Sequence, residues 1–389
     1  MRFVAAPDSF KGSLSAIEAS LCIERGVKGI FPDAVVQKFP IADGGEGLVK
    51  TVIAAAGGNL IEVQVVGPIG QTVKAVCGIL DDGETGLIEV ASACGLPLVG
   101  PEQRNPEQTT SYGVGELILK LVDSGCRRIV VGLGGSATND GGVGMASALG
   151  IRFLDSERQI VETNVGNLEY VSEIDLSGLD PRLAEVEIIG ACDVDSPLCG
   201  PHGASAVFGP QKGATPEQVN HLDHLLQHLG TLLYQTTGRN IAEIPGAGAA
   251  GGLGAGLLGF LGARLVKGSA LVLGLIGLDQ VFASGGIDLV ITGEGEINGQ
   301  TVLGKAPIAV AELAKRYGLP IVAMTGSLGP GYTAVYQHGI DSVQCIVSRP
   351  MSLEEAMHNA ASMLEDAVDQ LIRTWQINRG RGINSERLS

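Results

Sequence analysis

Short apolar segments alternate with helix-forming segments at both ends of this chain, and this alternation most restricts its fold. Towards the C-terminus, the pattern predicts a helix over 305–317, a strand over 319–324, a helix over 331–338 and a strand over 341–346. At the N-terminus, "RFVAAP" predicts a buried strand, and the capping box "SAIE" opens a helix. Strands that alternate with helices form parallel sheets, so both ends predict βαβ units.

The middle of the chain has a different pattern. Three strand-like segments, "NLIEVQVV", "QTVKAVCGIL" and "TGLIEVAS", follow one another with short turns, which is typical of antiparallel strands. A long helix is expected later, over 353–375, because its apolar residues keep helical spacing. We therefore predict a parallel sheet formed by the two terminal thirds and a separate α/β insertion between them.

Charge and composition exclude several classes of partner. The formal net charge of −16 over 389 residues argues against nucleic acid and against an anionic membrane surface. The uncharged segment 246–263 approaches the length of a membrane span, but its many glycines favour a soluble helix packed closely against other backbone. Seven scattered cysteines without a CxxC pair, and no signal-peptide pattern, predict a reduced cytoplasmic protein.

One glycine-rich loop, "GLGGSATNDGGVG" over 132–144, follows a short strand and precedes a helix. It matches only the first part of the dinucleotide fingerprint, and no P-loop motif is present. Backbone N–H groups, Ser136, Thr138, Asn139 and the positive end of the helix would favour an anion there. The alternative is a turn in which the glycines serve packing alone.

Other glycine-containing loops bring acidic and basic groups together. Eight acidic residues lie in these loops: Asp8, Asp43, Glu46, Asp140, Asp193, Asp195, Glu294 and Glu296. Three lysines, Lys11, Lys212 and Lys305, lie in or beside them. Phosphoryl transfer needs a divalent cation on oxygen ligands, a group that orients the hydroxyl, and cations for the phosphate, so the set points to a kinase. Several loops follow strands, where open α/β sheets bind ligands.

Seven ordered blocks carry a resemblance to a known family. They are "APDSFKGSLSA", "ADGGEG", "GLGGSATNDGG", "ACDVDSPLCGP", "FGPQKGA", "GAGAAGGLG" and "TGEGEINGQT". From about residue 1 to 376 the chain resembles the type I glycerate kinases. The resemblance implies transfer of a phosphoryl group from ATP to D-glycerate, with Mg²⁺, giving 2-phosphoglycerate and ADP. It also implies an active site in the cleft between two domains.

Together with the resemblance, the element pattern predicts two α/β domains. One is Rossmann-like with a parallel sheet and is discontinuous in sequence, and the other is an inserted mixed-sheet domain. We expect the Rossmann-like domain over 1–60 plus 286–378, the inserted domain over 61–285, and a disordered tail over 379–389. For the oligomeric state of the protein, we consider a homodimer.

The resemblance and charge logic also suggest roles for individual residues. Asp193 is assigned as the base that orients the glycerate hydroxyl, with Asp195 as support, and both as metal ligands. Ser136, Thr138 and Asn139 are expected to hold the glycerate carboxylate or a phosphate. The remaining assignments are phosphate contact for Lys11, Ser9, Ser13 and Lys305, substrate or metal positioning for Asp43 and Glu46, and cofactor binding for Gly134, Gly135 and Glu294.

The chain departs from the family pattern at one block, where relatives usually read "TGEGRIDGQT". Glu296 stands where Arg is usual, and Asn298 stands where Asp is usual. Arg is a preferred bidentate partner of phosphate and carboxylate, so the exchange could change a ligand contact. It could also replace a pair that never meets a ligand. Two alternatives therefore accompany the kinase prediction, a kinase of a related small hydroxy acid and a glycerate- or nucleotide-binding sensor without turnover.

Overall fold

The structure is a computed structural model that describes residues 1–42, 45, 47–162 and 165–384. The chain forms two compact units. Unit 1 combines residues 1–43, 54–56 and 269–389, and unit 2 combines residues 44–53 and 57–268. The return to unit 1 thus occurs at 269, whereas the sequence placed it at 286.

Unit 1 is built on a parallel sheet, as predicted. Its strands, within the described residues, are β1 (Arg2–Pro7), β2 (Val35–Lys38), β11 (Leu289–Ile297), β12 (Ile321–Leu328) and β13 (Ser342–Cys345). They lie in the order β13-β12-β11-β1-β2, and each neighbouring pair is parallel. Counted along unit 1 alone, this is the doubly wound order 2-1-3-4-5. The fold class expected from the sequence, with a Rossmann-like parallel sheet in a discontinuous unit, is confirmed.

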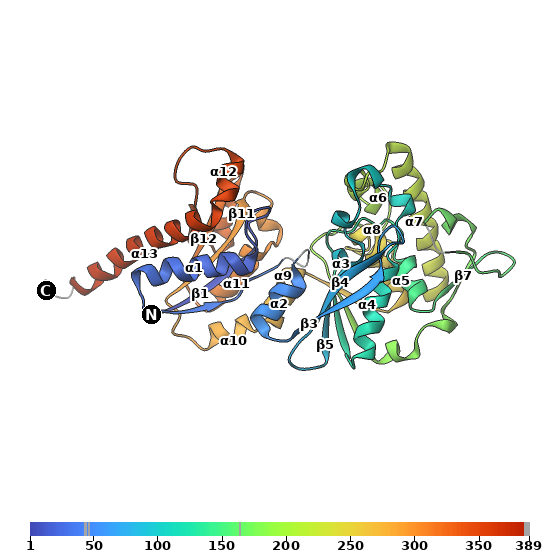
Figure 1. Ribbon diagram of the computed structural model, residues 1–389, viewed down its shortest axis with the longest axis horizontal. Helices are drawn as coiled ribbons and strands as arrows, with labels where there is room; N and C mark the ends of the chain where they lie inside the picture. Colours follow the sequence, from blue (N-terminus) through green and yellow to red (C-terminus); the bar gives the residue numbers. More distant parts are fainter. Residues whose placement is uncertain (43–44, 46, 163–164, 385–389) are drawn as a thin grey trace. The chain divides into compact units, whose positions relative to one another are not determined.

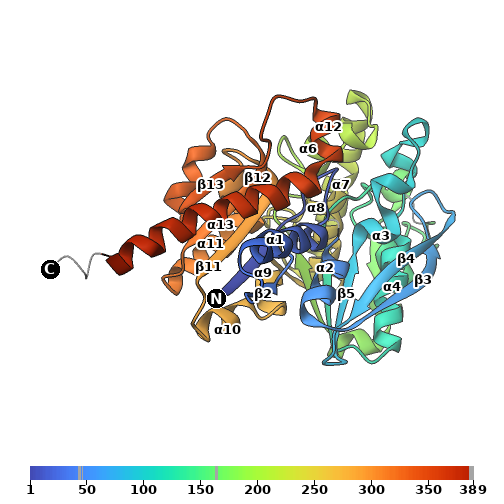
Figure 2. The same cartoon turned by 60° about the vertical axis from the view of Figure 1, so that its left-hand side comes forward.

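Helices cover both faces of this sheet. Those that belong to unit 1 are α1 (Ala16–Ile30), α9 (Gly268–Leu275), α10 (Leu278–Ala283), α11 (Ala306–Arg316), α12 (Leu353–His358) and α13 (Ala360–Asn384). One buried cluster joins Phe3 of β1 and Ile291 of β11 to Ile23 of α1 and Leu364 of α13. Helices α1 (blue) and α13 (red) therefore share one face (Figures 1 and 2). Helix α11 contacts β1, β11 and β12 from the other face.

Local sequence signals explain where these helices begin and end. The Ser15 hydroxyl accepts a hydrogen bond from the Glu18 N–H, and the Glu18 carboxylate accepts one from the Ser15 N–H, so the predicted capping box forms. The helix expected over 353–375 is interrupted at Asn359, which ends α12 with φ −99° and ψ 10°. Its side-chain amide donates to the Glu355 carbonyl at 2.9 Å, beside the backbone bond from the Asn359 N–H to the same carbonyl. Helix α13 then continues to Asn384, whereas the sequence predicted a disordered tail from 379.

The order of strands in unit 1 opens a crevice beside β11. Strand β1 pairs with β11 only as far as Pro7 and Gly293, while β11 continues along β12 to Ile297. Beyond Gly293, β11 pairs with β12 alone, and the loop after β1 lies beside it, since a Cβ on Gly295 would be 3.1 Å from the Lys11 backbone nitrogen. A doubly wound sheet binds ligands at such a switch point, outside the carboxyl ends of the strands.

Unit 2 contains a mixed sheet. Its described strands are β3 (Asn59–Val66), β4 (Thr72–Ile79), β5 (Thr85–Glu89), β6 (Arg128–Gly132), β9 (Glu187–Ala191) and β10 (Arg264–Val266), in the order β10-β9-β6-β5-β4-β3. Strands β3, β4 and β5 are antiparallel neighbours, and the other pairs are parallel. The antiparallel middle predicted from the sequence is confirmed. A small separate pair consists of β7 (Arg152–Leu154) and β8 (Glu173–Asp175).

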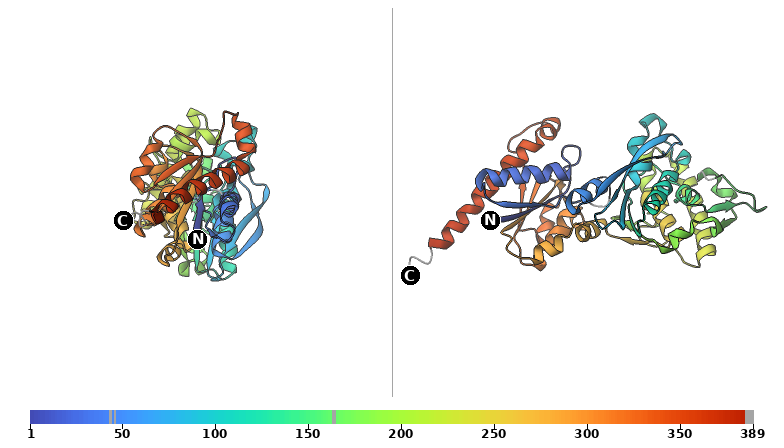
Figure 3. Two further views of the ribbon diagram at one scale, coloured as in Figure 1. Left: turned by 90° about the vertical axis from the view of Figure 1, so that its left-hand side faces the viewer. Right: turned by 60° about the horizontal axis from the view of Figure 1, so that its bottom comes forward.

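The helices of unit 2 surround a second core. They are α3 (Val90–Cys94), α4 (Tyr112–Asp123), α5 (Val143–Ala148), α6 (Ala204–Phe208), α7 (Pro216–Thr237) and α8 (Ala249–Phe260), while α2 (Leu48–Ala56) starts in unit 2 and ends in unit 1. Two further views show the chain coloured along its sequence (Figure 3). The glycine- and alanine-rich segment forms α8, which is buried as expected, but it is kinked near its start, where Ala250, Gly251 and Gly252 have positive φ. Among the described residues, no helix has the length and apolar content that a bilayer span requires.

Candidate active site

The loop after β1 carries three of the predicted phosphate-binding residues. The Ser9 N–H donates to the Asp8 carboxylate at 2.6 Å, and the Ser13 hydroxyl donates to the Phe10 carbonyl at 2.8 Å. These bonds fold the loop into a tight turn over the end of the strand. Lys11 is exposed at its tip, and its side chain makes no ion pair or hydrogen bond with the described part of the chain.

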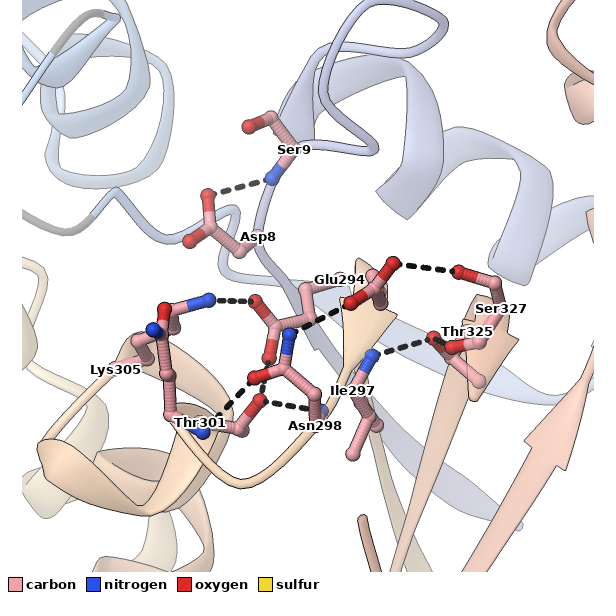
Figure 4. Close-up of polar contacts among 11 residues, drawn as sticks. Asp8, Ser9, Glu294, Ile297, Asn298, Thr301, Lys305, Thr325 and Ser327 are labelled. Atoms are coloured by element: carbon pink, nitrogen blue, oxygen red, sulfur yellow. Dashed lines mark hydrogen bonds and ion pairs between the residues drawn. The ribbon is translucent and has the colours of Figure 1, made fainter. Parts of the chain in front are cut away.

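The loop after β11 holds a second lysine in place (Figure 4). Glu294 is 7% exposed, and its carboxylate accepts from the Thr301 hydroxyl at 2.7 Å and from the Lys305 ammonium at 3.3 Å. The Lys305 side chain is 37% exposed at the start of α11. A buried carboxylate thus orients a lysine that remains accessible, which suits contact with an anion.

The two residues that depart from the family pattern contact each other. The Asn298 amide donates to one Glu296 oxygen at 2.6 Å, and the Ser327 hydroxyl donates to the other at 3.2 Å (Figure 4). The residues at the two altered positions are therefore hydrogen-bonded to each other. Both residues line the same cavity in unit 1 as Lys11 and Lys305.

In unit 2, the glycine-rich loop follows β6 as predicted. A Cβ on Gly134 would lie 2.5 Å from the Gly45 Cα, so glycine is required there for a close backbone approach. Ser136, Thr138 and Asn139 are 6%, 0% and 0% exposed. The Asn139 amide donates to the Ser205 hydroxyl at 2.9 Å. The side chains expected to hold a ligand are thus directed into the protein.

Lys212, which the sequence placed only among the lysines available to a phosphate, contacts this loop from elsewhere in the chain. It is 3% exposed, and its ammonium donates to the Ser136 hydroxyl at 3.0 Å and to the Thr138 carbonyl at 2.7 Å. Burial lowers the pKa of Lys212 to about 8. Its position in the block "FGPQKGA" was the available signal, but the pattern could not show that the lysine is buried.

A buried carboxylate supports the same loop. Asp140 is 1% exposed and accepts from the Ser111 N–H and hydroxyl, both at 2.8 Å, from the Gly142 N–H at 3.1 Å and from the Gly144 N–H at 3.3 Å. Burial raises the pKa of Asp140 against the effect of these bonds. Asp140 therefore fixes the turn into α5 and is a structural residue of the loop.

The loop after β9 carries the predicted base and metal ligands. One Asp193 oxygen accepts from the Gly268 N–H at 3.0 Å, which orients the carboxylate. Asp195 is mostly exposed, and its carboxylate lies 3.3 Å from the Lys267 ammonium. Within the described residues, no cluster of three or more His, Cys, Asp or Glu side chains is arranged to hold a metal. Asp43 and Glu46, also predicted for the site, lie outside the described residues.

Comparison with known proteins identifies the family of the chain. The model of the glycerate kinase family matches residues 3–376. Glycerate kinase of Halalkalibacterium halodurans is 47% identical over 96% of this chain and 98% of its own length. Glycerate 2-kinase of Escherichia coli is 46% identical over 92% of this chain and 94% of its own length. A crystal structure assigned as glycerate kinase 2 of Salmonella typhimurium LT2 superposes with a TM-score of 0.88, at 44% identity, over 98% of this chain and 99% of that one.

The α/β fold, the loop lysines and carboxylates, and these full-length relatives define an enzyme of the kinase class. The chain belongs to the glycerate kinase family.

Proposed function

We propose that this protein transfers the γ-phosphoryl group of ATP to the 2-hydroxyl of D-glycerate, giving 2-phosphoglycerate and ADP. A relative 46% identical over 92% of the chain is a glycerate 2-kinase, which supports the acceptor position. The geometric observation that carries the proposal is the pair of accessible lysines, Lys11 and Lys305, on one cavity at the switch point of the parallel sheet. Positioned cations are what a transferring phosphoryl group requires.

On the donor side, Lys11 and Lys305 would contact the phosphates. Ser9 and Ser13 lie in the same loop as Lys11 and offer hydroxyl and backbone groups to phosphate oxygens. Glu294 acts through Lys305, whose ammonium it holds at 3.3 Å. We therefore assign Glu294 as a positioning residue on the cofactor side.

On the acceptor side, Asp193 would accept the hydroxyl proton. The glycerate oxygen forms a bond to the γ-phosphorus while the bond from that phosphorus to the β–γ bridging oxygen breaks, and ADP leaves. The proton moves to the Asp193 carboxylate, which the Gly268 N–H holds at 3.0 Å. Asp193 is thus a candidate general base that the backbone orients before substrate arrives.

The carboxylates present fit a magnesium ion. Mg²⁺ is usually held by one or two protein carboxylates together with substrate phosphates and water, so a cage of three protein ligands is not required. Asp193 and Asp195 are the residues that would hold it, since both provide carboxylate oxygens in one loop. When bound, the ion would offset negative charge on the phosphates.

The glycine-rich loop would hold an anionic group through its backbone. Gly135 is exposed and Gly134 is half-buried, whereas the side chains of Ser136, Thr138 and Asn139 face inward. The buried side chains would fix the loop, and the backbone at the glycines would meet the ligand. That this loop and the lysine cavity serve one active site stays a prediction.

The test is release of ADP from Mg-ATP with and without D-glycerate, followed by an enolase-coupled measurement of 2-phosphoglycerate. We expect ADP release that depends on glycerate, together with an enolase signal. ADP release without that signal would contradict the 2-hydroxyl as acceptor. Turnover only with another small hydroxy acid would contradict the substrate, and glycerate binding without ADP release would favour a sensor.

Asp193 is tested separately by Asp193→Asn. We expect kcat to fall by at least about 100-fold, because a general base contributes about 10²–10⁴-fold. Asp155→Asn is a matched control, since Asp155 is another half-buried loop aspartate that accepts backbone N–H bonds in unit 2. An Asp193→Asn enzyme with normal turnover would remove Asp193 from the base role.

A further inference from the structure

The cavity at the switch point of unit 1 has two chemically different walls. Its volume is about 600 Å³. The loops after β1 and β11 form a polar wall that includes Ser9, Lys11 and Lys305. Leu353 and Met357 of α12, with Met363 of α13, form an apolar wall. The volume lies within the range of small-molecule sites, about 300–1,000 Å³.

The apolar wall presents side chains that the protein itself leaves uncovered. Leu353 is 77% exposed and Met357 is 36% exposed. They are four residues apart on α12, so they lie on the same side of that helix. Two exposed apolar side chains that both line a cavity indicate a ligand with an apolar surface to cover them.

The two walls meet where the backbone of the Lys11 loop lies against the Met357 side chain. Gly12 follows Lys11 and has a φ of +80°, and a Cβ at Gly12 would lie 2.7 Å from the Met357 terminal methyl group. The loop that carries Lys11 therefore rests against the apolar helix. A ligand that reaches Lys11 with an anionic group can place an adjoining apolar group against Met357.

We propose that this cavity is the nucleotide site, with the phosphates of ATP towards Lys11 and Lys305 and the adenine base against Leu353 and Met357. This inference rests on the proposed kinase function and assigns the base-binding surface within it. The other substrate does not fit the apolar wall, because glycerate carries a carboxylate and two hydroxyls on three carbons. A purine base presents a flat, largely apolar face that thioether and branched aliphatic side chains cover well.

The experiment measures ADP binding by calorimetry and steady-state kinetics for Leu353→Ala and Met357→Ala. We expect each variant to weaken ADP binding and to raise the KM for ATP by about 10-fold, since each removes exposed carbons that the bound base would cover. The KM for glycerate and kcat should change by less than about 2-fold, because neither side chain reaches the reacting atoms under this proposal. Ile377→Ala is the control, as Ile377 is a 58% exposed apolar residue of unit 1 outside the cavity.

Inorganic tripolyphosphate separates base binding from phosphate binding. Its affinity should be the same in wild type and in both variants, because it has no base. Equal losses for tripolyphosphate and ADP would overturn the proposal, since α12 would then act on the phosphate loop. Unchanged ADP binding would also overturn it. ADP binding is measured without turnover, so a wild-type protein that binds ADP but transfers no phosphate would defeat the proposed function and leave the nucleotide site supported.

Discussion

The buried ammonium of Lys212 leads to a prediction about stability. Lys212→Met removes the charge while keeping a long, unbranched side chain in the same space. In the folded protein, Lys212 is 3% exposed and reaches only neutral acceptors by hydrogen bonds, the Ser136 hydroxyl and the Thr138 carbonyl, among the described residues. Burial lowers its pKa from 10.5 to about 8, and this shift sets the pH range of the effect.

The sign of the effect follows from proton binding in the two states. Between about pH 8 and 10.5, the unfolded chain holds the Lys212 proton and the folded chain does not. The free energy of unfolding therefore rises with pH across this window. Below about pH 8, the folded protein bears the full cost of burying the charged Lys212 ammonium. At about 1.36 kcal/mol per unit, the shift amounts to about 3 kcal/mol. For a unit of this size, that corresponds to a change of about 6–12 °C in Tm.

Scanning calorimetry of wild type and Lys212→Met at pH 7 and pH 10.5 tests this reasoning. Titrating groups away from Lys212 affect both proteins equally, so the difference between the two Tm values reports Lys212 together with its charged neighbours Asp140 and Cys94. We expect that difference to move by about 6–12 °C in favour of wild type at pH 10.5. Lys120→Met, at an exposed lysine of unit 2, should show no such movement. If the Tm difference between wild type and Lys212→Met changes by less than about 2 °C between the two pH values, the buried charge would be refuted.

Two further predictions concern packing and the altered pair. Gly251→Ala should lower the free energy of unfolding by about 3 kcal/mol or more, because its Cβ would lie 1.9 Å from the Thr138 carbonyl oxygen. Gly262→Ala, where φ is also positive but nothing lies within 4 Å, should lower it by only about 1–2 kcal/mol, and equal losses in thermal melts would contradict the packing argument. Glu296→Arg and Asn298→Asp should each lower Tm. In the double variant, the loss in free energy of unfolding should be about 0.5–1 kcal/mol smaller than the sum of the two single losses. Strict additivity would show that the pair is not coupled.

The strand and helix pattern of the terminal thirds was predictable because it depends on residues close in sequence. The strand "RFVAAP" is buried in β1, and the capping box at Ser15 forms as expected. The antiparallel middle strands and the glycine-rich turn after β6 were also predictable. Local propensity did not predict the interruption of the C-terminal helix at Asn359. It also did not predict that the helix expected over 331–338 is the 3-10 helix Tyr332–His338.

The candidate site was predictable only as a set of loops. The sequence selected Lys11, Lys305 and Glu294, and the structure brings them to one cavity at the switch point. It did not indicate that Lys212 is buried. Nor did it indicate that Leu353, expected within a continuous amphipathic helix, is 77% exposed and lines that cavity.

The sequence by itself determined the elements, the α/β class and the family, because periodicity, capping and ordered motif blocks are encoded in neighbouring residues. Only the tertiary structure decided the electrostatic state of Lys212, the contact between Glu296 and Asn298, and which loops share a cavity. A shifted pKa and a ligand cavity depend on desolvation and on partners far apart in the chain, such as Ser136 and Lys212. The order of strands in the folded sheet, which local pattern does not encode, sets those distances.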